Sequence, residues 1–238
     1  MVYWVRDPTR RFRERPHYRP EEIDNACEHL VREFLLKHRG RVEFPLTTDD
    51  LTVLIEQHVR DLDLYADLST DGTDVEGVTR FAVGHQPSIS IAEPLSSDER
   101  RANRLRTTLA HELGHAKLHD EVFQMAFSSG DLFANGREAR IVCKRETMID
   151  AHQTDWMEWQ AGYASGAYLM PKSLIHDHLR PVIAASNRLP PFHVADAAAP
   201  ALIEAMVGRF AVSREAAKVR LIKLGFLTTA ARSPTLFD

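Results

Sequence analysis

Cysteine is scarce in this sequence, and long apolar runs are missing. The chain has 238 residues and two cysteines, Cys27 and Cys143, which lie far apart, so we do not expect a disulfide framework. No stretch approaches ~20 apolar residues, which excludes a membrane-spanning helix. The basic N-terminus lacks the apolar core of ~7–15 residues that a secretory signal needs. These absences predict a cytoplasmic protein without a membrane partner.

An excess of positive charge is also missing. The formal net charge is −4, which gives no general argument for nucleic-acid binding. Hydrophobic residues make up 44% of the chain and charged residues 27%, as in globular proteins with a packed core. This composition excludes a disordered chain, a collagen-like chain and a coiled coil.

Helical patterns dominate the chain, with one β-rich run between them. Apolar spacing predicts helices over 21–39, 48–59, 98–118, 156–169, 201–209 and 213–224. The apolar run over 78–91, broken by a turn-like segment at 84–87, predicts a β-hairpin, and its part around 88–91 is a candidate edge strand for pairing with an extended peptide. Prolines indicate an irregular arm over 1–20, and residues 120–154 lack clear periodicity.

These patterns predict an α+β fold that is mainly helical and has a small β-sheet. We expect three parts: an N-terminal arm and helix over 1–40, a core over 41–180, and a C-terminal helical segment over 181–238. A proline-rich stretch near 189–200 separates the core from the last two helices.

The sharpest motif is His111-Glu112-Leu113-Gly114-His115, an H-E-x-x-H pattern on the helix predicted over 98–118. Residues four apart on a helix lie one above the other, so both imidazoles can reach one tetrahedral zinc ion. Glu112 then points to the open side of the metal, where it can accept a proton from water. The motif therefore predicts a zinc site with Glu112 as the catalytic base.

Three residues compete to be the third ligand. His119 lies eight residues after His111, about 12 Å along the helix axis, so a straight helix cannot bring both to one ion. Glu121 would need a glycine turn before it, but the turn position holds Leu118. Glu158 lies on the next strong helix, as in glutamate-ligated zinc peptidases, and is our choice. Small residues on that helix (Ala161, Gly162, Ser165 and Gly166) allow it to approach the histidine helix closely.

The sequence resembles the ImmA/IrrE family of zinc metallopeptidases. Three segments carry the resemblance: Arg-Thr-Thr-Leu-Ala-His-Glu-Leu-Gly-His-Ala-Lys-Leu-His (106–119), Glu-Trp-Gln-Ala (158–161) with Leu-Met-Pro (169–171), and Phe-Ala-Val-Ser (210–213) with Arg-Leu-Ile-Lys-Leu-Gly-Phe (220–226). The resemblance covers roughly 42–226. It implies Zn²⁺ ligands at His111, His115 and Glu158, a zincin-like core of the glutamate-ligated (gluzincin) type, and cleavage of repressor-type regulators.

Two positions depart from the family pattern. The family often has Asn or Asp at the position of Gly162, where it can orient a ligand histidine. Gly162 cannot do this, so Asp155 is the expected substitute. The family's Phe two residues later is Ala164 here, a loss of volume that Tyr163 or Tyr168 can offset.

Other side chains are weaker candidates for the site. Tyr163, Tyr168, His119 and His152 are possible donors to a developing oxyanion, although each residue type is more often a packed aromatic or a surface histidine. Cys143 is a possible cap on the zinc in a latent state, against the more common role of a plain buried thiol.

The favoured function is a zinc-dependent endopeptidase that cleaves a protein partner, such as a helix-turn-helix repressor or an antitoxin-type regulator. A toxin of a two-gene module would use the same chemistry. The alternative from another class is a DNA-binding regulator, because Ser213 can cap a helix with four basic residues: Arg214, Lys218, Arg220 and Lys223. Its apolar positions and the acidic net charge make this alternative less favoured.

Overall fold

The computed structural model describes residues 3–129, 138–144 and 155–230. The chain divides into two compact units, Met1–Leu169 and Met170–Asp238. Both units contain helices and small sheets, so the protein belongs to the α+β class, as expected. None of the described helices combines the length and apolar character needed to cross a bilayer.

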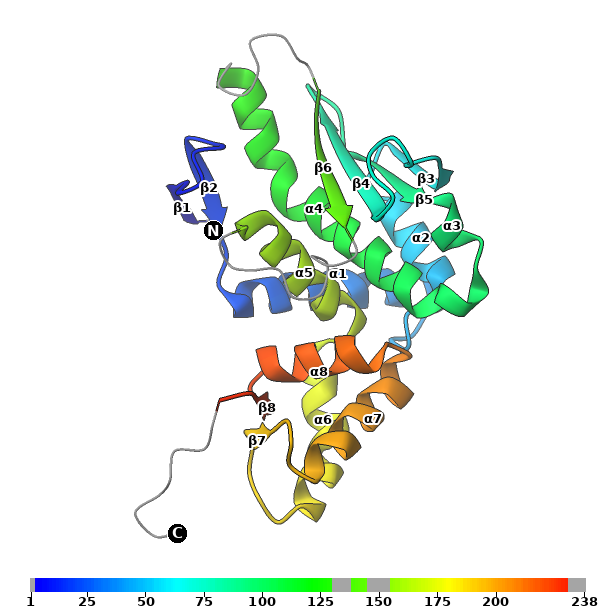
Figure 1. Ribbon diagram of the computed structural model, residues 1–238, viewed down its shortest axis with the longest axis vertical. Coiled ribbons are helices and arrows are strands. Elements are labelled where there is room, and N and C mark those ends of the chain that lie inside the picture. The colour runs from blue at the N-terminus through cyan, green and yellow to red at the C-terminus, as the bar shows by residue number, and fades with distance from the viewer. Residues whose placement is uncertain (1–2, 130–137, 145–154, 231–238) are drawn as a thin grey trace. The chain divides into compact units, whose positions relative to one another are not determined.

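The first unit contains a four-stranded sheet, a two-stranded hairpin and the longest helices (Figure 1). Its elements are β1 (Tyr3–Arg6), β2 (Glu14–His17), α1 (Pro20–Arg39), α2 (Thr48–Glu56), β3 (Asp61–Ala66), β4 (Val75–Ala82), β5 (Ser88–Ala92), α3 (Glu93–Ser96), a 3₁₀ turn (Glu99–Arg101), α4 (Ala102–Ser129), β6 (Glu138–Lys144) and α5 (Trp156–Leu169).

The four-stranded sheet has the order β3-β5-β4-β6. β4 and β5 form the expected antiparallel hairpin, with Thr79 opposite Ile89. β3 runs parallel to β5, and β6 runs antiparallel to β4. The expectation that the segment around 88–91 forms an edge strand is therefore wrong, because β5 is paired on both sides. Among the described strands of this sheet, the terminal ones are β3 and β6.

Within the segment expected to be an irregular arm, residues 3–17 form a hairpin. β1 pairs antiparallel with β2, with Trp4 opposite Pro16. Phe12, in the loop between them, is 5% exposed and packs edge-on against Phe123 of α4, with ring centroids 5.1 Å apart. This burial of an aromatic ring holds the hairpin on the core, so prolines in this segment mark strand and turn positions.

Two elements occur where the sequence showed no periodicity. α4 continues to Ser129, and its last turns bury Val122, Phe123 and Ala126. Residues 138–144 form β6, which buries alternate residues at Ala139, Ile141 and Cys143. The expected unstructured excursion over 120–154 is therefore wrong at both of these places.

The close approach of α4 and α5 depends on small residues on both helices. A Cβ atom added to Gly114 would lie 3.1 Å from the Ala161 Cα and 3.3 Å from the Ala164 Cβ. The Ser165 hydroxyl donates a hydrogen bond to the Thr107 carbonyl at 3.1 Å. The expected contact through small residues is confirmed at Ala161 and Ser165, and Ala164, where the family has Phe, lies against the glycine of the motif.

The second unit is a small helical unit with a short parallel strand pair. It contains α6 (Lys172–Ala185), β7 (Phe192–His193), α7 (Ala198–Phe210), α8 (Arg214–Lys223) and β8 (Leu227–Thr228). α6 is absent from the sequence-based expectation. The expected boundaries near 40 and 180 also differ from the observed one, because residues 1–40 belong to the first unit and the division falls after Leu169.

In this unit, one of the four basic residues that suggested a helix-turn-helix is buried. Ser213 does cap α8, since its hydroxyl accepts a hydrogen bond from the Ala216 backbone amide at 3.1 Å. Arg220, however, is 2% exposed, and its Nε donates to the Met170 carbonyl at 3.2 Å. Arg214 pairs with Glu204, and Lys218 with Glu215. Arg220 therefore cannot face a nucleic acid.

Candidate metal centre

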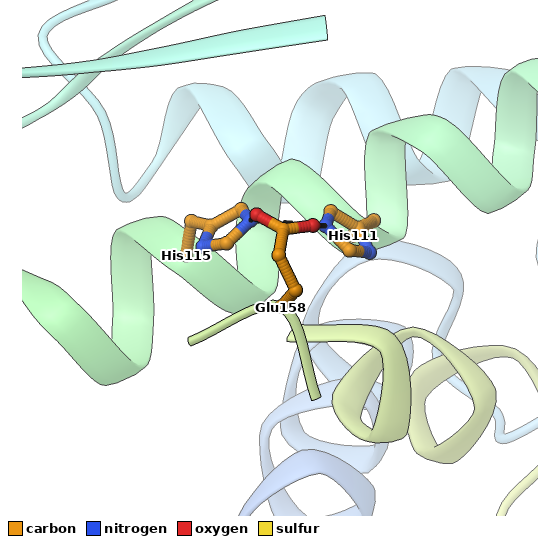
Figure 2. A group of neighbouring side chains, drawn as sticks. All are labelled: His111, His115 and Glu158. Atoms are coloured by element: carbon orange, nitrogen blue, oxygen red, sulfur yellow. Dashed lines mark hydrogen bonds and ion pairs between the residues drawn. The ribbon is translucent and has the colours of Figure 1, made fainter. Parts of the chain in front are cut away.

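One face of α4 brings His111 and His115 together one turn apart. Both side chains are fully buried, and their Nε2 atoms lie 2.9 Å from each other. Glu158, near the start of α5, extends its carboxylate between the two rings (Figure 2). Its Oε2 lies 3.2 Å from His111 Nε2 and its Oε1 lies 3.2 Å from His115 Nε2.

The donor atoms fit a small cation. Ligands around a tetrahedral zinc ion lie about 3.3 Å apart, because metal–ligand bonds are ~2.0–2.1 Å long. The three separations at this site are 2.9, 3.2 and 3.2 Å. Two buried imidazole nitrogens and a carboxylate also form a donor set that divalent transition metals prefer. This buried cluster could hold a metal ion.

Glu158 is positioned by the beginning of its helix. Asp155 Oδ1 accepts a hydrogen bond from the Glu158 backbone amide at 3.4 Å, and its carbonyl accepts from Trp159 at 2.9 Å. Asp155 therefore acts as a helix cap that fixes the turn carrying Glu158. Burial opposes ionisation of Glu158, but the neighbouring His115 and His111 outweigh it and lower the pKa of this carboxyl group. The same pairing raises the pKa of His115 despite the opposing effect of burial.

Glu112 lies beside the three donors but is held by the sheet. Thr79 of β4 donates a hydrogen bond from Oγ1 to Glu112 Oε2 at 2.5 Å. Gly77, on the same face of β4, lies so close that any Cβ atom there would collide with the Glu112 carboxylate. Burial raises the pKa of Glu112, although the nearby imidazoles and the Thr79 hydroxyl favour its ionised form. The Glu112 carboxyl group can thus bind and release a proton at a pH closer to neutral than an exposed glutamate does.

The outer nitrogens of the two histidines have different surroundings. His115 Nδ1 lies 3.0 Å from His119 Nδ1, and His119 Nε2 lies 3.0 Å from Gln160 Oε1. Burial next to His115 lowers the pKa of His119 well below its usual value. His111 Nδ1 is buried and has no hydrogen-bond partner among the described residues. The hydrogen bond of the Asp155 side chain is the helix cap, and its role in place of the family's orienting side chain stays a prediction.

Cys143 of β6 lies next to this centre. Its Sγ, a His111 ring nitrogen and a Glu112 carboxylate oxygen all lie within 4.8 Å of one another. The thiol is fully buried, and this burial, with Glu112 and Glu158 nearby, raises the pKa of Cys143 well above its usual value. Neither Cys143 nor Cys27 takes part in a disulfide.

The remaining candidates occupy other places. Glu121 is exposed and lies outside the donor cluster. Tyr163 donates a hydrogen bond to Asp24 Oδ2 of α1 at 2.9 Å, and the Tyr168 hydroxyl lies against Cys27 of the same helix. A role for either tyrosine in the site remains a prediction. His152 lies outside the described residues.

Sequence reasoning missed three residues that contact the site: Gly77, Thr79 and Gln160. Two of them carried a usable signal: Gly77 directly precedes the β-rich run predicted over 78–91, a glycine in a strand often marks a close backbone approach, and Thr79 lies two residues later on the same face. Gln160 carried none, since its partners come from distant segments. In the comparisons, the chain matches no protein-family model and no curated protein sequence.

Proposed function

We propose that the protein is a zinc-dependent endopeptidase with a zincin-like catalytic unit, and that His111, His115 and Glu158 hold the zinc ion. The observation that carries this proposal is the convergence of three buried donor atoms at 2.9–3.2 Å beside a fourth, separately held carboxylate, Glu112. A structural zinc site is usually closed by four protein ligands, whereas three ligands leave a position for chemistry.

Glu112 supplies acid–base chemistry in this proposal. When bound, zinc supplies a Lewis acid that polarises a carbonyl group and makes water more acidic. Glu112 accepts the proton of the attacking water and returns it to the leaving nitrogen of the peptide. Thr79 holds the carboxylate at Oε2, and Oε1 has no hydrogen-bond partner among the described residues, so this oxygen is available for the proton.

The substrate in this proposal is an extended segment of a protein. β6 pairs only with β4 among the described strands, and its Cys143 lies next to Glu112 and His111. A peptide that adds to a sheet edge satisfies its backbone groups there and presents alternate side chains. The resemblance noted from the sequence points to a helix-turn-helix repressor or a similar regulator as the partner. A cytoplasmic setting is part of this proposal, and two cysteines that form no disulfide are compatible with it.

Peptide-library cleavage read by mass spectrometry tests the proposal without knowledge of the partner. The zinc-loaded wild-type protein is incubated with peptides from a digested bacterial proteome, beside Glu112→Gln as the matched control. An amide cannot accept the proton, so we expect the variant to keep its zinc and to cut ~10²–10⁴-fold more slowly. Equal cleavage by both proteins would assign the base to another residue, and no cleavage by either would contradict the peptidase function.

A further inference from the structure

A histidine binds a metal through a nitrogen lone pair, so the position of its single proton decides whether it can serve as a ligand. For His115 this position follows from a chain of contacts that ends in the N-terminal hairpin. The Pro16 carbonyl oxygen of β2 can only accept a hydrogen bond, and Gln160 Nε2 donates to it at 3.1 Å. This bond fixes the orientation of the Gln160 amide, whose Oε1 then faces His119 Nε2 at 3.0 Å.

The proton positions of both histidines follow from that orientation. Because the Gln160 oxygen only accepts, His119 must carry its proton on Nε2. A neutral His119 then has its lone pair on Nδ1, which lies 3.0 Å from His115 Nδ1. His115 must donate from Nδ1, so a neutral His115 has its lone pair on Nε2, the atom that faces His111 and Glu158.

The alternative is a doubly protonated His119, and its surroundings disfavour it. His119 is fully buried, and its contacts are the His115 ring, the Gln160 amide and the edge of Trp156, none of which carries a negative charge. A buried positive charge without a partner is costly. Such a His119 would also donate from both nitrogens and force the proton of His115 onto Nε2.

We propose that His119 and Gln160 are positioning residues that set the tautomer of His115, and that the N-terminal hairpin anchors them through the Pro16 carbonyl. The inference rests on the proposed metal site but not on peptide cleavage. It makes the hairpin part of the metal centre, because its carbonyl determines which way the Gln160 amide turns. Metal affinity should then depend on residues that touch no metal.

The same substitution at two glutamines separates positioning from a general loss of stability. Gln160→Leu removes the acceptor of His119 Nε2 and frees His119 to move its proton to Nδ1, whereas Gln124→Leu removes an amide that contacts the backbone of Ala82 and Gly84. Zinc affinity is measured on full-length protein by competition with a chromogenic chelator. We expect Gln160→Leu to bind zinc ~10–100-fold more weakly and Gln124→Leu to remain close to wild type. Wild-type affinity in Gln160→Leu, or an equal loss in both variants, would overturn the proposal.

The tautomer itself can be read on the wild-type protein, which avoids any doubt about folding of the variants. Nitrogen-15 NMR of the zinc-loaded protein, with the His119 imidazole assigned by His119→Asn, should show His119 protonated on Nε2 with an unprotonated Nδ1, and His115 protonated on Nδ1. A His119 proton on Nδ1 would overturn the proposal. Neither readout involves cleavage, so an inactive wild-type protein would end the proposed function and leave this inference standing.

Discussion

Glu112 and Glu158 are both buried carboxyl groups near the same two imidazoles, yet their pKa values move in opposite directions. Glu158 lies between the imidazole nitrogens and is stabilised in its ionised form. Glu112 accepts a hydrogen bond from the Thr79 hydroxyl on one oxygen. Burial nevertheless outweighs this bond and the nearby imidazoles, so the pKa of Glu112 is raised. When the surroundings shift the pKa values of two neighbouring carboxyl groups in opposite directions, the two groups typically have different roles. One stays charged as a ligand or nucleophile, and the other serves as an acid–base group.

Glu158 and Glu121 provide a matched test of ligand identity at the residue scale. Without Glu158, only His111 and His115 would remain, and two protein ligands bind zinc far more weakly than three. We expect Glu158→Ala to lose most of its zinc on dialysis, whereas Glu121→Ala, at an exposed position, should keep it. Elemental analysis of the dialysed proteins gives the answer. Zinc loss in Glu121→Ala together with retention in Glu158→Ala would reverse the assignment.

At the scale of elements, the site depends on the crossing of α4 and α5. Gly114, which lies between the two ligand histidines in the sequence, packs against the backbone of Ala161, so the distance between the helices sets the reach of Glu158. α4 also presents its opposite flank to β4, where Gly77 leaves room for Glu112. The two carboxylates are thus carried by different helices and supported by different neighbours.

Two helical glycines predict opposite effects of the same substitution. Gly114→Ala places a methyl group 3.1 Å from the Ala161 Cα, whereas Gly208→Ala meets nothing within 4 Å. Alanine favours helix by about 1 kcal/mol over glycine, and overpacking costs ~1–3 kcal/mol. We expect Gly114→Ala to destabilise the protein and to lower zinc affinity, and Gly208→Ala to be neutral or stabilising. Urea unfolding measures the stability of both variants. Equal stabilisation by the two substitutions would show that α4 and α5 are not tightly packed at Gly114.

The predictable part of the fold is the part with local patterns. The helix of His111 and His115 follows from apolar spacing, and the choice of Glu158 follows from axial geometry and the small residues of its helix. The strand over 138–144 was not predicted because its alternation is short and is interrupted by Val142 at an outward position. The hairpin escaped because its stability comes from Phe12 packing on Phe123, which are distant in sequence. Gln160 escaped for the same reason, since its hydrogen bond reaches back to Pro16.

At the scale of the whole molecule, the candidate centre lies entirely within the first unit. Residues from the hairpin, β4, β6, α4 and α5 contact it or its neighbours, so a bound metal ion would stabilise these elements together. Binding to the folded state alone stabilises a protein by about 2.7 kcal/mol when the free ligand is 100-fold above its Kd.

Metal removal should therefore weaken the first unit selectively. We expect a strong chelator to lower the temperature at which tryptophan fluorescence reports unfolding, and added zinc to restore it. All three tryptophans of the chain (Trp4 of β1, and Trp156 and Trp159 of α5) lie in the first unit, so they report on the unit that carries the site. His111→Ala, measured in parallel, should unfold at the same temperature with and without chelator. A chelator effect of equal size in that variant would place the stabilising metal elsewhere.

The most direct test of the account is the metal content of the protein itself. Purified without chelators and analysed by elemental mass spectrometry, the wild-type chain should carry about one zinc ion, and a His111→Ala, His115→Ala double variant should carry almost none. A wild-type protein that contains no transition metal and takes up none on incubation with zinc would contradict the metal centre and the function proposed for it.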